Sequence, residues 1–295
     1  MRSSALTSLI PAAALLSFSF ALAFCVAAVA ETASESRTAT QEGRERAGDT
    51  SWIETGFARK FGIHEPIYFI HGSRDPAAKF QISFKYRLLG DPGDVAPLRT
   101  TRGLFFGYTQ RSIWDIKAIS GPFHDTSYMP ELLYQSAVPV PNSDDFQLAW
   151  LGWQASVLHE SNGRDGPESR SIDIIYFRPA FLLGCPNGWR LVFSPKILTN
   201  IRSLRENPDI KKYRGYAEWR FSVGKKFGVE LATNARIGSN ARHGSVQFDL
   251  TYPVKIPSVD FAAYLHVQYF EGYGESILDY YKRVSKLRFG FSVSR

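Results

Sequence analysis

Cysteine is almost absent from this sequence, and long apolar runs are absent beyond its first 30 residues. Its two cysteines are Cys25 and Cys185. If Cys25 is removed with an amino-terminal leader, Cys185 remains alone and the mature chain cannot form an internal disulfide. No later stretch reaches the roughly 18 uninterrupted apolar residues that a spanning helix needs. Residence in a membrane would therefore have to come from strands.

Residues 1–30 have the pattern of a secretory signal peptide. A charged start at Arg2 precedes an apolar run over 9–25, and residues 28–30 read Ala-Val-Ala. A short apolar run before an Ala-x-Ala site predicts cleavage after Ala30. The alternative is a retained membrane helix, which Pro11 disfavours because it interrupts the apolar run.

Cleavage lowers the formal net charge from +7 to +6, because residues 1–30 carry one basic residue and no acid. A basic surface suits anionic partners such as nucleic acid or lipid headgroups. Export favours lipid, so we expect a membrane partner and no nucleic acid. Residues 31–60 are rich in Ser, Thr, Glu, Arg and Gly without a sustained period, which predicts a flexible leader ahead of a folded domain at 61–295.

Apolar residues take every second position in much of this domain, as expected for strands with two unlike faces. The alternating segments are 80–88, 213–223, 245–252, 261–269 and 287–293. Turn-forming clusters lie between such segments, at Asp91-Pro92-Gly93, Pro141-Asn142-Ser143-Asp144 and Gly238-Ser239-Asn240.

Counting strand-like runs from about 66 to 294 gives roughly twelve. We therefore predict an all-β fold, a transmembrane antiparallel β-barrel of about twelve strands, because closure pairs every backbone polar group. A soluble β-sandwich also alternates. The 14 Tyr, 22 Phe and 6 Trp favour the barrel, since aromatic girdles mark its membrane interfaces.

The segment His159-Glu160-Ser161-Asn162-Gly163-Arg164 carries the candidate chemistry. On a strand, His159 and Ser161 project from the same face. Because the odd positions from Ala149 to Val157 are apolar, we expect both to face outward, and Asp173 to join them from the next strand. A histidine that activates a serine and is oriented by a carboxylate is the arrangement of a hydrolytic triad. His-x-Ser alone is a weak pattern, and ordinary polar residues at a loop edge would look the same.

This segment, with Pro167, Ser169, Arg170 and Ser171, resembles the active-site segment of outer membrane phospholipase A. Further stretches match in order over roughly 65–291, and they are Tyr108-Thr109-Gln110, Pro122-Phe123, Asn207-Pro208-Asp209-Ile210 and Gly272-Tyr273-Gly274-Glu275-Ser276. The resemblance implies a twelve-stranded, calcium-dependent barrel in the bacterial outer membrane. It also implies activation by dimerisation and cleavage of the sn-1 and sn-2 acyl esters of phospholipids and lysophospholipids.

The resemblance also assigns roles to residues. His159 would be the base, Ser161 the nucleophile and Asp173 the orienting residue. The backbone amides of Ser161 and Gly163, with a water on the calcium, would stabilise the oxyanion. The resemblance assigns three calcium ligands and one interface residue: the main-chain oxygens of Arg164 and Ser169, Ser120 from the partner barrel, and Gln110 at the dimer interface.

Two departures from the family pattern bear on these roles. Asp173 replaces the family's Asn, and a carboxylate accepts the imidazole N–H at least as well, so activity should persist. Gly166 replaces an Asp, with Asp165 one step earlier, which puts the calcium site of the resting monomer in doubt. The alternative functions are a catalytically silent structural or porin-like barrel and, more distantly, a soluble secreted esterase.

Overall fold

The computed structural model describes residues 60–90, 101–256 and 261–295. The predicted signal peptide, the leader up to residue 59 and the turn cluster at 91–93 lie outside these residues. Strands dominate the described part, and none of its helices is long and apolar enough to cross a membrane. The strands are β1 (Phe61–Gly62), β2 (Tyr68–Gly72), β3 (Ala78–Leu89), β4 (Thr101–Trp114), β5 (Phe123–Ala137), β6 (Gln147–Ser161), β7 (Ser171–Gly184), β8 (Trp189–Phe193), β9 (Lys196–Asn200), β10 (Ala217–Lys225), β11 (Glu230–Ile237), β12 (Gly244–Ile256), β13 (Phe261–Gly272) and β14 (Val284–Ser292).

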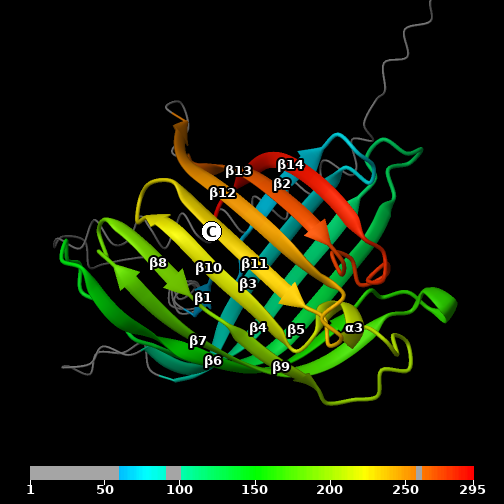
Figure 1. Cartoon of the computed structure of the whole chain (residues 1–295), viewed down its shortest axis with the longest axis horizontal. Helices are drawn as coiled ribbons and strands as arrows, with labels where there is room; N and C mark the ends of the chain where they lie inside the picture. The colour runs from blue at the N-terminus through cyan, green and yellow to red at the C-terminus, as the bar shows by residue number, and fades with distance from the viewer. Residues whose placement is uncertain (1–59, 91–100, 257–260) are drawn as a thin grey trace, which may run out of the picture.

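These strands close into an antiparallel barrel in which sequence neighbours are spatial neighbours (Figure 1). β14 pairs with β2, and β3 pairs with both β2 and β4, so the sheet returns on itself. Two barrel positions are each shared by two short strands. β1 and β2 both pair with the same side of β3, and β8 and β9 both lie between β7 and β10. The barrel therefore has twelve strand positions, which confirms the predicted all-β architecture.

Apolar side chains cover the outward face of the barrel. Val157 on β6 and Ile175 and Phe177 on β7 are exposed, whereas their sequence neighbours Ser156 and Tyr176 are buried. The expected outward odd face is thus correct for this part of the sheet. The alternation has the period that a strand gives to its two faces.

The expected outward face is wrong at Ala149 and Leu151. The exposed residues there are Leu148 and Trp150, because a bulge between Trp150 and Gly152 shifts the register of β6 against β7. An extra residue in one strand changes which positions point outward. The even positions point outward on one side of it and the odd positions on the other. Only beyond this bulge do the odd positions point outward, and His159 and Ser161 lie in that part.

The expected strand over 213–216 is also wrong. Residues Lys211–Arg214 form one short helical turn, α3, and β10 begins at Ala217. Gly215 ends the turn with a φ of 65° and a ψ of −152°, a conformation that glycine adopts without strain. The buried Arg214 of this turn reaches into the barrel, which periodicity alone does not show.

Hydrogen-bonded and ionic side chains fill the lumen. Buried Lys79 and Arg288 both bind Glu275, with closest approaches of 3.2 and 2.5 Å. Glu131 accepts hydrogen bonds from His64, Ser156 and Tyr176, and Glu65 pairs with Arg178 and Arg220. A cavity of about 190 Å³ remains among these groups. Pairing of this kind satisfies buried charges that would otherwise be costly.

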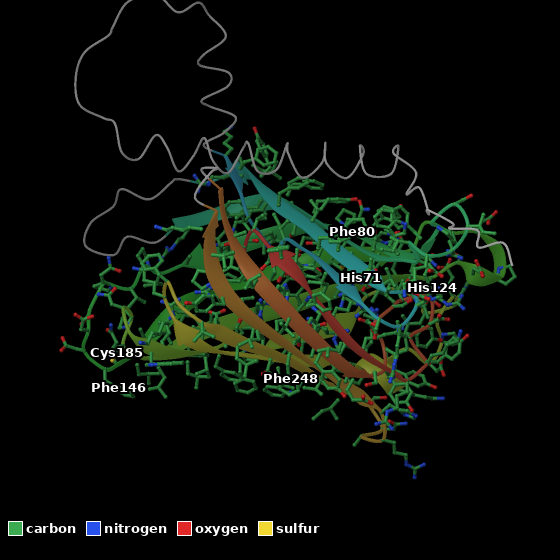
Figure 2. All side chains as sticks on the ribbon, turned by 90° about the horizontal axis from the view of Figure 1, so that it is seen from above. His71, Phe80, His124, Phe146, Cys185 and Phe248 are labelled. Atoms are coloured by element: carbon green, nitrogen blue, oxygen red, sulfur yellow. The ribbon has the colours of Figure 1, made fainter. Side chains whose placement is uncertain are left out.

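The two ends of the barrel differ. Figure 2 shows Phe146 and Cys185 at one end and His124 at the other. The end near Cys185 has the short turns 185–188 and 226–229 and the nine-residue connection 138–146. Arg295 donates to the carbonyls of Lys225, Lys226 and Gly228 there. The end near His124 carries the longer connections 162–170, 201–216 and 273–283. The candidate site lies at the end with the longer connections.

Candidate active site

The hairpin of β6 and β7 brings the three predicted catalytic side chains together. His159 lies directly opposite Asp173 in the antiparallel register, and Ser161 lies opposite Ser171. Residues i and i+2 of one strand share a face, so Ser161 is on the same outward face as His159. The register of this hairpin, which the strand periods do not specify, places Asp173 beside the histidine.

The imidazole and the carboxylate form a hydrogen bond of 2.9 Å between His159 Nδ1 and Asp173 Oδ1. The His159 side chain is 42% exposed, and the Asp173 side chain is 19% exposed. This contact directs Nδ1 to the carboxylate and leaves Nε2 free for another partner. Within the described residues the Ser161 hydroxyl makes no hydrogen bond to His159, so the last contact of a triad is not closed. Such contacts are commonly long in enzymes without substrate.

Gly163 follows Ser161 in a conformation that only glycine adopts readily. Its φ is +66°, and a Cβ placed there would lie 3.1 Å from Cε2 of Tyr128. Tyr128 comes from β5, where it pairs directly with Ser161. The backbone after the serine is therefore held close to the barrel wall, with the amide of Gly163 two residues from the Ser161 hydroxyl.

Asn162 organises the loop 162–170, a role that sequence reasoning missed although the residue belongs to the quoted motif. Its side chain donates to the carbonyl of Glu168 at 2.8 Å and accepts from the amides of Arg164 and Arg170 at 3.3 and 3.0 Å. Its backbone amide also donates to the carbonyl of Arg170 at 3.0 Å. A buried polar side chain with these partners fixes the loop that carries the predicted calcium ligands.

Glu160, between the histidine and the serine, points the opposite way. It is buried and accepts from Ser127 Oγ at 2.9 Å and from an Arg214 guanidinium nitrogen at 2.8 Å. A nitrogen of Arg111 lies 3.7 Å from the same carboxylate. These inward contacts anchor the strand of the candidate site from the lumen side. Alternation predicts that Glu160 points inward, but it does not identify its partners.

Arg202 is a second residue that sequence reasoning missed. It follows β9, where the amide of Ile201 donates to the carbonyl of Asp173 at 2.9 Å. Arg202 Nε lies 3.7 Å from Asp173 Oδ2, and its side chain is 78% exposed. The Asp173 carboxylate is thus shared between His159 and a solvated cation. No sequence spacing predicts this contact, because Arg202 reaches the site only through the pairing of β7 with β9.

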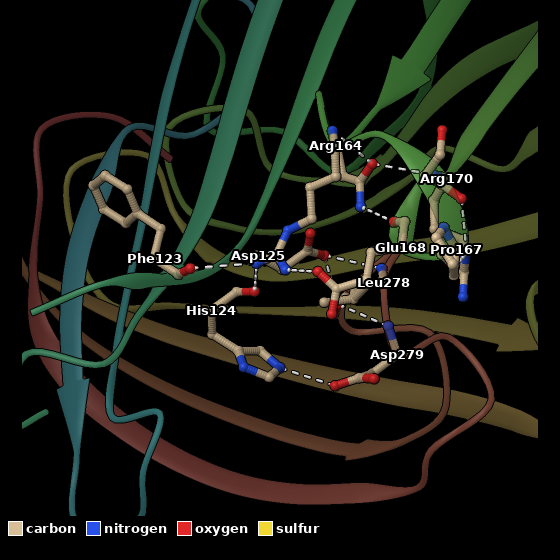
Figure 3. A network of polar contacts seen from close by, with 12 residues as sticks. Phe123, His124, Asp125, Arg164, Pro167, Glu168, Arg170, Leu278 and Asp279 are labelled. Carbon is tan, nitrogen blue, oxygen red and sulfur yellow. Dashed lines mark hydrogen bonds and ion pairs between the residues drawn. The ribbon is translucent and has the colours of Figure 1, made fainter.

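Arg164 connects the loop 162–170 to the start of β5. Its guanidinium pairs with Glu168 and donates to the carbonyl of His124 at 2.6 Å (Figure 3). His124 Nε2 lies 2.9 Å from Asp279 Oδ2 in the connection 273–283. The network therefore joins two long connections at the site end of the barrel to one strand.

The predicted calcium ligands lie at this end of the barrel, and their environment is suited to a cation. The carbonyls of Pro167 and Ser169 both accept hydrogen bonds from Arg170, at 2.9 and 2.7 Å, so these oxygens already converge on a positive charge. Oxygen donors of this kind are what calcium prefers. Among the described residues no cluster of three or more His, Cys, Asp or Glu forms a metal site, so main-chain oxygens would have to contribute.

Ser120 and Gln110, the two residues assigned to a second barrel's contact, both lie on the surface. Exposed Ser120 has a φ of 65°, an uncommon value for a residue with a side chain, and such strain often marks functional loops. Gln110 accepts from Tyr108 at 3.1 Å and donates to Ser112 at 3.3 Å on β4. It shares its strand face with exposed Phe106, which makes it a polar group on an apolar surface.

Fold and site together define a transmembrane β-barrel with a serine, a histidine and a carboxylate on its outward face. Comparison with known proteins identifies the family. The phospholipase A1 family model matches residues 68–293, and the chain belongs to this family.

Relatives and solved structures agree with this assignment. Phospholipase A1 of Klebsiella pneumoniae is 32% identical over 217 residues, which cover 70% of this chain and 67% of the relative. Phospholipase A1 of Escherichia coli K12 is 30% identical over 216 residues, covering 70% of this chain and 66% of the relative. The matched stretch spans only 50% of a longer relative in Neisseria meningitidis, at 32% identity. The Salmonella typhi outer membrane phospholipase dimer with bound calcium superposes with a TM-score of 0.63 at 25% identity, covering 79% of this chain and 91% of that one.

Proposed function

We propose that this chain is a calcium-dependent phospholipase of the bacterial outer membrane that is active as a homodimer. It hydrolyses the sn-1 and sn-2 acyl esters of phospholipids and lysophospholipids. The observation that carries the proposal is the 2.9 Å contact between His159 Nδ1 and Asp173 Oδ1 on the outward face, with Ser161 two residues along that face. Polar groups on the lipid side of a barrel are costly unless they serve a purpose.

The orientation of the barrel supports a site at the outer leaflet. Outer-membrane barrels carry short periplasmic turns and longer extracellular loops. The short turns 185–188 and 226–229 are opposite the end that bears the loop 162–170 together with the longer connections 201–216 and 273–283. Lipid in the outer leaflet would therefore reach Ser161 sideways from the membrane, without entering the lumen.

The residues of this chain perform the reaction in two halves. His159 Nε2 removes the Ser161 proton while the hydroxyl oxygen attacks the acyl carbonyl, and Asp173 stabilises the resulting imidazolium. The amides of Ser161 and Gly163 donate to the oxyanion. The imidazolium then gives its proton to the departing glycerol oxygen. In the second half His159 removes a proton from a water molecule, whose oxygen attacks the acyl-serine carbonyl. The imidazolium returns that proton to the departing Ser161 oxygen as the fatty acid is released.

The main-chain oxygens of Arg164 and Ser169, with Ser120 from a second copy of the chain, would hold the calcium ion. When bound, calcium supplies positive charge close to the developing oxyanion. A ligand set divided between two barrels makes the site complete only in the dimer. Gln110 on the outward face of β4 supports such a dimer. Its amide can form hydrogen bonds beyond those with Tyr108 and Ser112, and a second barrel would supply partners that lipid cannot.

Fatty-acid release from phospholipid in mixed micelles tests the proposal. Ser161→Ala should abolish release, and a chelator should abolish it in the unmodified protein. Ser171→Ala is the matched control, because Ser171 is the cross-strand neighbour of Ser161 on the same face and should be dispensable. Heat-dependent gel mobility verifies that each variant forms a barrel. Undiminished release by a folded Ser161→Ala protein would falsify the assignment, and no release from any protein would favour a silent structural barrel.

A further inference from the structure

One side chain occupies the place where the loop 162–170 gathers its carbonyl oxygens. Arg170 donates through the same guanidinium nitrogen to the carbonyl of Pro167 at 2.9 Å and to that of Ser169 at 2.7 Å. Figure 3 shows Arg170 turned back onto its own loop beside Pro167, while Arg164 extends away toward β5. Two carbonyl oxygens that share one cationic donor form a position suited to positive charge.

In the part of the chain that the structure describes, the guanidinium of Arg170 has no counter-charge of its own. Among the described residues it forms no ion pair with a carboxylate, whereas Arg164 in the same loop is paired with Glu168. The Nε of Arg170 is buried and has no hydrogen-bond partner. A guanidinium normally recruits a carboxylate or several acceptors. The interaction of Arg170 is therefore concentrated on the two carbonyls.

We propose that the carbonyls of Pro167 and Ser169 form a calcium-binding position, and that the Arg170 guanidinium occupies it until calcium displaces it. The inference rests on the calcium dependence in the proposed function and adds Pro167 as a ligand and Arg170 as a competitor. Calcium cannot approach either oxygen closely while the guanidinium lies against both. The arginine therefore lowers calcium affinity and keeps these oxygens paired in the calcium-free chain.

Removal of the Arg170 side chain should leave the loop in place. The contacts of Arg170 that organise the loop use its backbone, since its amide donates to Asn162 Oδ1 and its carbonyl accepts from the Asn162 amide, both at 3.0 Å. Asn162 also holds the carbonyl of Glu168. An Arg170→Met variant thus retains the loop and loses the competing cation.

Calcium titration by calorimetry, in detergent and on the Ser161→Ala background, measures this competition without any contribution from hydrolysis. Arg170→Met should bind calcium about tenfold more tightly than the parent, the effect of one charge-assisted hydrogen bond that no longer needs to be broken. Arg170→Lys keeps the positive charge and should bind more weakly than Arg170→Met. Arg202→Met is the matched control, because it removes an exposed cation close to the site that does not touch these carbonyls. Its affinity should change by less than about twofold.

Unchanged or weaker calcium binding by Arg170→Met would overturn the inference, because the guanidinium would then support the site instead of competing for it. An equal gain in calcium affinity in Arg202→Met would also overturn the inference, because loss of any nearby positive charge would then explain the gain. Either of these two outcomes leaves the proposed function intact, provided that the parent binds calcium and the unmodified protein hydrolyses lipid in its presence. If neither the parent nor Arg170→Met binds calcium, the calcium dependence itself fails, and this inference fails with it.

Discussion

Replacement of Asp173 tests how the carboxylate assists the histidine. Two unit charges about 4 Å apart interact by about 4 kcal/mol at an effective dielectric of 20. The His159 side chain is 42% exposed, so solvent screening should reduce this to about 1–2 kcal/mol in the transition state. Asp173→Asn keeps an acceptor for Nδ1–H but loses the charge, so kcat should fall about tenfold. Asp173→Ala also loses the orienting hydrogen bond, and kcat should fall about a hundredfold.

The assay is initial-rate fatty-acid release from mixed micelles. Asp145→Asn, in the exposed connection between β5 and β6, should leave the rate unchanged. An Asp173→Ala protein that keeps more than about a third of the activity would refute the orienting role, since the hydrogen bond would then contribute almost nothing.

Two further predictions concern the loops at the site end. Gly163→Ala should lower activity about tenfold or more, because a side chain there meets both a φ of +66° and a β5 ring at 3.1 Å. Gly166→Ala, at a φ of +59° with no atom within 4 Å, isolates the cost of the backbone conformation, so equal losses in initial-rate assays would contradict the role of the close contact. Burial raises the pKa of the Glu275 carboxyl, but the charges of Lys79 and Arg288 lower it by more than burial raises it. The net pKa is about 2. A carboxyl with a lowered pKa contributes stability above its unfolded value of 4.5, and this contribution is lost as the pH falls toward 2. Urea unfolding should therefore show Glu275→Gln to be less stable than the unmodified chain at pH 6, with a difference that narrows below pH 4.5, and a difference independent of pH would contradict the ionic role.

Alternation of side chains predicts the barrel well, because each strand must present one face to apolar surroundings and the other to the lumen. It fails where the backbone departs from a regular strand. At Leu151 a bulge exchanges the faces of β6, and at Gly215 a positive φ ends a helical turn that apolar spacing had suggested was a strand. Both departures depend on local backbone conformations, and the pattern of apolar residues does not predict such conformations.

The candidate site also has a part that the sequence predicts and a part that it does not. His159 and Ser161 share a face by strand geometry alone, so their proximity could be predicted. The contact of Asp173 with His159 depends on the register of the hairpin, and that of Arg202 depends on how β9 pairs with β7. The convergence of Arg170 on two carbonyls depends on the fold of a single loop. Alternation on the next strand predicts that Asp173 faces outward beside the pair, but side-chain patterns contain no direct signal for the individual contacts.

Covalent labelling of the nucleophile tests the central claim most directly. The protein is incubated with an alkyl fluorophosphonate in detergent and calcium, and the modified residue is located by peptide mass spectrometry. The label should appear on Ser161 and not on its neighbour Ser171, and His159→Ala should prevent labelling, because the hydroxyl needs a base to become nucleophilic. Lipid hydrolysis that proceeds while the label falls on another residue, or labelling of Ser161 that is unaffected by His159→Ala, would contradict a serine nucleophile activated by the histidine.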